Sequence, residues 1–165
     1  MLKKQALLIF IMTCMLAFTG CGEREELTVF NEQINDFYTE VSVLETEIAS
    51  MDAETEDAVS VLLTHLQKMG TKFQQLADVE VPVEFISVEE LAEDAASYMQ
   101  EAVRLYEEAY AEEYVNDALI QAAAENYEYA MKRVNYIAII LQGEIPEGAT
   151  VIETDGTEFE PYTGE

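Results

Sequence analysis

The chain has 165 residues, half of them hydrophobic, and 34 Asp and Glu against 8 Lys and Arg give it a formal net charge of −26. This charge argues against nucleic acid, anionic lipid headgroups and anionic wall polymers as partners, because all three would be repelled. A disordered acidic chain would have fewer hydrophobic residues, so we expect one folded domain with a charged exterior.

Residues 1–20 have the order of a secretory signal peptide. Lys3 and Lys4 precede an uncharged, mostly apolar run at residues 5–18, and small residues follow that run. The run is short for the roughly 20 residues that a transmembrane helix needs, and the charged residues 23–26 follow closely. A retained transmembrane anchor is therefore the weaker alternative.

Thr19, Gly20 and Cys21 resemble the lipobox of bacterial lipoproteins, in which a peptidase cuts before a cysteine that carries diacylglycerol. Phe18 departs from the motif, which usually has leucine there. The resemblance implies that residues 1–20 are removed and that Cys21 is the lipid attachment residue. The alternative is that Cys21 is a buried or paired thiol.

Lipid attachment at Cys21 implies a place for the protein: the cell membrane, lipid-anchored on the extracytoplasmic side. The other cysteine, Cys14, would leave with the signal peptide, so the mature chain would have no internal disulfide. The mature chain would keep six Lys and Arg against 34 Asp and Glu, a formal charge of −28.

Two amphipathic helices are expected next, over residues 25–51 and 53–77, because apolar residues recur there at alternating spacings of three and four. Asp52 is the expected N-cap of the second helix. The apolar positions of the first are Leu27, Phe30, Ile34, Phe37, Val41, Leu44, Ile48 and Met51. Those of the second are Val59, Leu62, Leu66, Met69, Phe73 and Leu76.

A proline-containing loop separates the second helix from a third, expected over residues 88–112. Ser87 and Glu90 have the spacing of a capping box, and Ile86 and Leu91 have that of a hydrophobic staple. The apolar face of the third helix consists of Leu91, Ala95, Tyr98, Ala102, Leu105 and Ala109.

A fourth helix is expected over residues 115–142, with Asn116 or Asp117 as its cap. Its apolar face consists of Ile120, Ala124, Tyr127, Met131, Val134, Ala138 and Leu141. No Gly or Pro separates the last two helices, so one long bent helix is the alternative. Four stripes with short connections predict an all-α fold, an antiparallel up-down four-helix bundle over residues 21–142.

Residues 143–165 lose this periodicity and are interrupted by Gly and Pro, which indicates a flexible or loosely docked acidic tail that is dispensable for the fold. Part of the tail faintly resembles a calcium loop. Val151 and Tyr162 stand where the EF-hand pattern requires Asp and Glu, so we predict no calcium site there.

His65 is the single histidine and the obvious candidate ligand or base. Leu62 stands three residues before it, so there is no Glu-x-x-His motif of the di-metal type. Leu66 occupies the apolar stripe and places His65 on its flank. We expect a structural or solvent-facing role, and metal or haem ligation with a Met partner is the alternative.

The remaining candidate residues are expected to fill the core or to solvate the surface, without a catalytic or ligand-binding role. Met51, Met69 and Met131 lie on apolar stripes, where filling gaps in the core is the usual role of methionine. There is no Gly-x-Ser-x-Gly nucleophile motif, and the many carboxylates are expected to solvate the surface. We therefore predict no catalytic residue, no metal site and no cofactor.

Tyr106, Tyr110 and Tyr114 recur at four-residue spacing in the third helical region. Such a stripe either flanks the bundle core or forms a partner-binding face, since Tyr is enriched in interface anchors.

The lipobox-like start together with an all-helical body is similar to the small helical-bundle lipoproteins of Gram-positive bacteria. This resemblance implies a membrane-anchored, non-enzymatic interaction or accessory module, with a protein or peptide partner bound at a bundle face. An extracytoplasmic protein that binds a cation, metal or haem is the alternative. The sequence does not indicate an oligomeric state.

The first prediction is that salt stabilises the mature domain without a specific metal site. Like charges at i, i+4, such as Glu89 with Glu93 and Glu108 with Glu112, each cost about 0.2–0.5 kcal/mol at low ionic strength. Thermal unfolding of residues 22–165 should shift equally in sodium chloride and in calcium chloride of matched ionic strength. A saturable gain at micromolar calcium alone would contradict the prediction.

Overall fold

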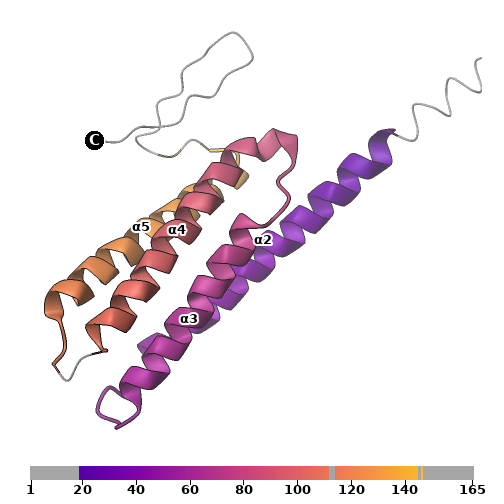
Figure 1. The fold of residues 1–165 in the computed structure, drawn as a ribbon. Coiled ribbons are helices and arrows are strands. Elements are labelled where there is room, and N and C mark those ends of the chain that lie inside the picture. Colours follow the sequence, from indigo (N-terminus) through magenta and orange to yellow (C-terminus); the bar gives the residue numbers. More distant parts are fainter. Residues whose placement is uncertain (1–18, 112–113, 145, 147–165) are drawn as a thin grey trace, which may run out of the picture.

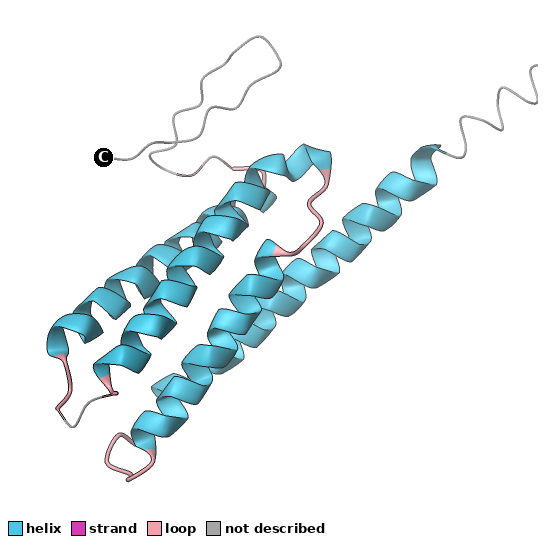
Figure 2. Cartoon of the chain, in the orientation of Figure 1, coloured by secondary structure: helices cyan, strands magenta, loops and turns pink. Residues whose placement is uncertain are grey.

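The computed structural model describes residues 19–111, 114–144 and 146, with side chains from residue 25 onward. Within these ranges the chain forms four long α-helices and no strand, packed as an antiparallel up-down bundle (Figure 1, Figure 2). The elements are α2 (Thr19–Ala49), α3 (Ala58–Ala77), the 3₁₀ helix η1 (Val83–Phe85), α4 (Ile86–Ala109) and α5 (Asp117–Leu141). The predicted all-α bundle is confirmed. Residues 1–18 of the predicted signal peptide and most of the predicted tail lie outside the described residues.

The two ends of the bundle contain different helix connections (Figure 1). The α2–α3 and α4–α5 connections lie at one end, which we call the distal end. The α3–α4 connection, the end of α5 and the start of α2 lie at the other, which we call the proximal end. Helices that follow one another in the chain pack together, and α4 with α5 forms the most extensive pair.

Aromatic side chains from α2 and α3 fill the centre of the core. Phe37 meets Phe73 edge to face, with ring centroids 5.2 Å apart, and neither ring is more than 5% exposed. The predicted stripes of these two helices are confirmed over most of their length, because the following members are all buried: Phe30, Ile34, Phe37, Val41, Leu44, Leu66, Met69, Phe73 and Leu76.

The predicted apolar face of α4 is confirmed at Ala95, Ala102, Leu105 and Ala109, whereas that of α5 was wrong by about one residue except at Val134. Tyr98 and Tyr127 are only partly buried, whereas Met99 is completely buried. The buried positions of α4 are Val88, Ala92, Ala95, Ala96, Met99, Ala102, Leu105 and Ala109, and those of α5 are Ala123, Ala130, Val134 and Ile137. Alanines lie around much of both helices, so spacing alone did not identify the buried face.

Helix α3 begins at Ala58, five residues later than the predicted start. Asp52 is not its N-cap. The Asp52 carboxylate instead accepts a hydrogen bond from the backbone N–H of Glu54, with 3.0 Å between the two heavy atoms. This contact stabilises a turn within the α2–α3 connection, as short acidic side chains commonly do.

The predicted capping box and staple at the start of α4 do not form. Helix α4 begins at Ile86, so Ser87 lies inside its first turn, and no side chain caps its N-terminus. Ile86 is 55% exposed and therefore cannot act as a staple. The chain instead enters α4 through η1, where Phe85 stacks on Phe30 of α2 with centroids 5.7 Å apart. A tertiary aromatic contact thus replaces the local cap.

Helices α4 and α5 are separate, so the alternative of one long bent helix was wrong. The Asn116 side chain accepts a hydrogen bond from the Leu119 N–H at 3.3 Å, which confirms it as the N-cap of α5. The backbone N–H of Asn116 also donates to the Ala109 carbonyl at 3.1 Å, which holds the connection against the end of α4.

The C-terminus of α5 closes with a Schellman motif. Gly143 has φ +78° and donates to the Ile140 carbonyl at 2.9 Å, while Glu144 donates to the Ile139 carbonyl at 3.1 Å. Pro146, a few residues further on, is buried. The segment predicted as a dispensable tail therefore starts with residues that belong to the bundle.

We predict that truncation after Pro146 preserves the stability of the bundle, whereas truncation after Gln142 lowers it. The shorter chain loses the Schellman hydrogen bonds and a buried proline. A loss of about 1 kcal/mol corresponds to roughly 4 °C in a domain of this size. Thermal unfolding followed by circular dichroism compares the two truncations. Equal melting temperatures would contradict a structural role for Gly143 and Pro146.

Candidate functional site

The predicted lipid attachment residue lies in the first turn of α2, which begins at Thr19. Among the side chains of this helix that the structure describes, from residue 25 onward, the first buried one is Phe30, nine residues after Cys21. At 1.5 Å per residue this segment is about 13 Å long. Figure 1 shows the start of α2 projecting beyond the other helices. The backbone of residue 21 is therefore about two and a half helical turns before the first described core position.

His65 lies between α2 and α3 near the distal end. Its Nδ1 atom is 3.2 Å from a carboxylate oxygen of Glu47, but the two atoms are not aligned as a hydrogen bond. The side chain is 14% exposed, and the neighbouring Leu66 is 3% exposed. His65 thus lies on the flank of the core, as expected, but is more enclosed than a solvent-facing residue. Among the described side chains, no three His, Cys, Asp or Glu converge on a possible metal position.

The methionines lie in or beside the core. Met69 and Met99 are fully buried, and Met131 packs against the core from α5. Met51 is partly buried just beyond the end of α2. Met99 was not assigned to the core from the sequence, although it lies beside the predicted face of α4.

The predicted tyrosine stripe is divided between core and surface. Tyr106 and Tyr110 are partly buried, whereas Tyr114 is 82% exposed. Burial raises the pKa of Tyr106, with a further contribution from nearby Tyr110. The three residues therefore do not form one exposed face. The stripe interpretation fails because α4 ends at Ala109, before Tyr110 and Tyr114.

Tyrosine hydroxyls connect α2 with α5, two helices that are not consecutive in the chain. Tyr38 donates to the backbone carbonyl of Val134 at 2.8 Å, and Tyr127 donates to a carboxylate oxygen of Glu45 at 3.1 Å. Burial raises the pKa of Tyr38 to about 12, and a backbone hydrogen bond near Ala138 opposes this shift. The pKa of Tyr127 is also raised, first by burial and then by the Glu45 charge.

A second group of tyrosines lies along the outer face of α4 and α5 with two bases. The rings of Tyr98 and Tyr129 are 5.4 Å apart, and the Arg133 guanidinium lies 5.2 Å from the Tyr98 ring centroid. Lys132 lies 5.6 Å from the ring of Tyr136. Arg133 also reaches Asp94 at 3.5 Å. The contacts of Tyr98 and Asp94 with α5 link the two helices at their surface, whereas Lys132 and Tyr136 both belong to α5.

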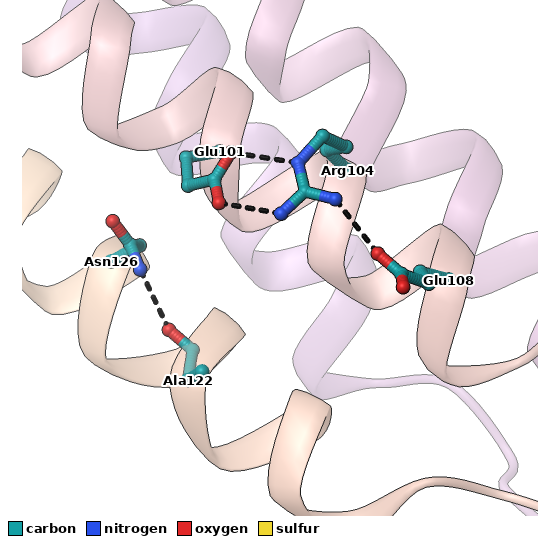
Figure 3. A network of polar contacts seen from close by, with 5 residues as sticks. All are labelled: Glu101, Arg104, Glu108, Ala122 and Asn126. Carbon is teal, nitrogen blue, oxygen red and sulfur yellow. Dashed lines mark hydrogen bonds and ion pairs between the residues drawn. The ribbon is translucent and has the colours of Figure 1, made fainter.

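Arg104 binds two acids of its own helix (Figure 3). It contacts Glu101 at 2.6 Å and Glu108 at 2.7 Å. The hydrogen bond with Arg104 lowers the pKa of Glu101. Glu108 is thus engaged by Arg104, and residue 112, with which repulsion was expected, lies outside the described residues. Nearby Asn126 donates to the Ala122 carbonyl of α5 at 2.9 Å and is satisfied locally.

Two shallow hollows, each of about 430 Å³, lie along α3. The one shared with α2 contains Lys72, which pairs with Glu40 at 2.8 Å and donates to the amide oxygen of Gln75 at 3.1 Å. The one shared with α4 is crossed by a hydrogen bond from Gln67 to Glu107 at 2.7 Å. A second amide hydrogen bond crosses it from Gln100 to Gln74. Both hollows are lined by polar side chains that already bind one another.

Gly70 brings α3 and α4 together beneath the hollow that they share. A Cβ atom at this position would lie 3.3 Å from a methyl group of Val103. Glycine costs about 1 kcal/mol relative to alanine inside a helix, so its presence here reflects the close approach of the two helices.

None of the helices in the described part of the chain has an apolar stretch long enough to span a membrane. The predicted absence of a calcium loop concerns Val151 and Tyr162, which lie outside the described residues. No protein-family model matches this chain, and comparisons with curated proteins and with solved structures find no match either.

We predict that the stability of the bundle falls as pH rises above about 10. An unfolded chain loses its tyrosine protons near pH 10, whereas folded Tyr38 keeps its proton until about pH 12. The folded state therefore binds more protons in this window, and the free energy of unfolding decreases with pH. Denaturant unfolding at a series of pH values measures this slope.

Tyr38→Phe should lower the free energy of unfolding at neutral pH by about 0.5–1.5 kcal/mol, because the hydrogen bond to Val134 is lost. The substitution should also make the free energy of unfolding fall less steeply between pH 10 and 12. The difference in stability between the variant and the unchanged chain should therefore narrow in that range. Tyr114→Phe, at a ring that is 82% exposed, is the control for the loss at neutral pH. An unchanged alkaline slope in Tyr38→Phe would refute the assignment.

Proposed function

We propose that this chain is an extracytoplasmic lipoprotein, held at the cell membrane by diacylglycerol on Cys21, and that its bundle is a non-enzymatic interaction or accessory module for a protein or peptide partner. The observation that carries the proposal is the geometry of α2. This helix begins within the lipobox-like sequence and continues, without interruption, to the core position Phe30 and beyond. The residue that would bear the lipid is therefore joined to the domain by continuous helix.

The energetics of such an anchor are favourable. Diacylglycerol contributes two acyl chains, and each buried methylene contributes about 0.8 kcal/mol, which makes two chains a stable anchor. The acidic mature chain would receive no electrostatic help from an anionic membrane surface. The lipid must therefore supply the attachment.

An interaction module is favoured over ligand chemistry by the described side chains. In the two hollows Lys72 and Gln67 bind neighbouring polar side chains, and His65 is approached by a single carboxylate. No observation in the described residues favours the cation, metal or haem hypothesis.

We predict that Cys21→Ala moves the protein from the membrane fraction to the soluble extracytoplasmic fraction. Cys14→Ala is the matched control, because this cysteine lies in the apolar run that the cleavage removes. It should leave the protein in the membrane fraction. Mass spectrometry of the unchanged protein should find diacylglycerol on a new N-terminal Cys21. An unmodified Cys21, or membrane retention of Cys21→Ala, would disprove the anchor.

A further inference from the structure

The single histidine of the chain lies in an enclosed position. Imidazole changes its charge between pH 5 and 8, where most other side chains do not. The His65 side chain is 14% exposed, and its Nδ1 atom is shielded from solvent without a hydrogen-bond partner among the described residues. Folded proteins rarely leave a buried polar atom in this state, so the surroundings of Nδ1 require an explanation.

A carboxylate from the neighbouring helix lies beside this atom. Glu47 of α2 places one carboxylate oxygen 3.2 Å from Nδ1 of His65. The Glu47 side chain is 47% exposed and can turn at little cost, whereas the imidazole is enclosed. A protonated imidazole is attracted by a carboxylate at this distance, and hydrogen bonds between such charged groups are short and strong. A neutral imidazole lacks that attraction, so the contact is stronger when His65 carries a proton.

A second contact joins the same faces of α2 and α3. Lys72 pairs with Glu40, with 2.8 Å between the ammonium nitrogen and a carboxylate oxygen. On each helix the two pairs are seven residues apart, which is about two turns, so both pairs follow one antiparallel register. A lysine ordinarily keeps its charge far above neutral pH, whereas a histidine does not. The two helices therefore share one contact that persists through neutral pH and one that depends on a proton.

Other charged groups near His65 are engaged elsewhere or exposed. On α2, Glu45 accepts a hydrogen bond from Tyr127 of α5. On the opposite flank of α3, Glu107 of α4 binds Gln67, and Arg104 of α4 pairs with acids of its own helix. The remaining groups are exposed, and at about 0.15 M salt their charges are screened over roughly 8 Å. They are Lys68 on α3 and, in the α2–α3 connection, Asp52, Glu54, Glu56 and Asp57.

We propose that protonation of His65 forms an ion pair with Glu47 that ties α2 to α3 near the distal end. Enclosure disfavours the charged imidazolium, and the Glu47 carboxylate offsets that penalty. The ion pair is present below about pH 6.5, where imidazole is protonated, and is lost as pH rises through neutrality. The link is a property of the bundle itself and operates whether or not Cys21 carries lipid.

Removal of the carboxylate should make the bundle sensitive to acid. In Glu47→Gln the enclosed imidazolium has no compensating charge, so the unfolded chain binds the proton more readily than the folded chain does, and stability falls with pH. Residues 22–165, which contain every residue described as buried, serve for the measurement. Relative to the unchanged domain, Glu47→Gln should lower the melting temperature by about 4 °C more at pH 5.5 than at pH 8.0.

Glu40→Gln is the matched control. Glu40 is 48% exposed and pairs with α3 as Glu47 does, but its partner is a lysine. Both substitutions remove one acid from α2, so their effects on the net charge are equal. Glu40→Gln should change the melting temperature by a similar amount at the two pH values. An equal pH dependence of the two variants would overturn the proposal.

Proton NMR gives a readout that does not depend on unfolding. A single histidine yields one isolated set of imidazole C–H signals, which can be followed from pH 5 to 8. In Glu47→Gln the midpoint of this titration should move to lower pH, and in Glu40→Gln it should move less. An unmoved midpoint in Glu47→Gln would refute the ion pair.

A double substitution separates the pair from the acids of the α2–α3 connection. In a His65→Gln background, Glu47→Gln should have the same effect on the melting temperature at pH 5.5 and at pH 8.0, because the proton that distinguishes the two conditions has no site. A pH-dependent effect of Glu47→Gln that persists without His65 would assign the acid sensitivity to the carboxylates and overturn the proposal.

Discussion

Alanine side chains allow α4 and α5 to approach each other closely, and the rest of the bundle is arranged around that pair. The contacts of Asp94 with Arg133 and of Asn116 with Ala109 fix an antiparallel register between the two helices. In this register the small buried residues lie at similar levels: Ala95 and Ala102 on α4, and Ala123 and Ala130 on α5. Side chains this small contribute little apolar area individually. Close backbone approach compensates by increasing the density of van der Waals contacts.

Helix α2 has the opposite composition, and its bulk fills the space that the alanines leave. Phe30, Ile34 and Phe37 project into the core from a helix whose close backbone contacts are mainly with α3. Across from α5 the separation is spanned by long side chains. Tyr38 and Tyr127 complete this contact with hydroxyl groups. A bundle with one tight pair and one side spanned by aromatic residues needs no disulfide or metal to define its arrangement.

Periodicity predicted the features that depend on large apolar residues, and it failed where small residues or tertiary contacts decide. The stripes of α2 and α3 were correct in their central parts, because Phe, Leu and Ile mark a face without ambiguity. On α4 the alanines Ala92, Ala95 and Ala96 are all buried, so the spacing of alanines does not mark a single face. Tyr98 was therefore assigned to the core, whereas the buried residue is its neighbour Met99. The start of α4 was also missed, since the contact of Phe85 with Phe30 joins positions 55 residues apart in the chain.

The candidate site was less predictable than the fold, because lipidation is recognised by a peptidase and a transferase and leaves no mark on packing. The sequence pattern predicts lipid attachment at Cys21, and the packing of the described side chains does not test that prediction. The partial exposure of the distal parts of the apolar stripes could not be read from the sequence. Val59 and Leu62 belong to the same periodic stripe as Leu66, and their incomplete burial becomes visible only when the helices are placed together.

Continuity of α2 links the proposed anchor to the packed part of the bundle. A single helix from Thr19 to Ala49 has no hinge of its own, and at 1.5 Å per residue it extends about 45 Å. If Cys21 carries the lipid, the proximal end would face the membrane and the distal end would point away from it. Acids at the distal end would then be repelled less by an anionic membrane than acids near the anchor. The proposed anchor would thus orient the whole bundle through one helix.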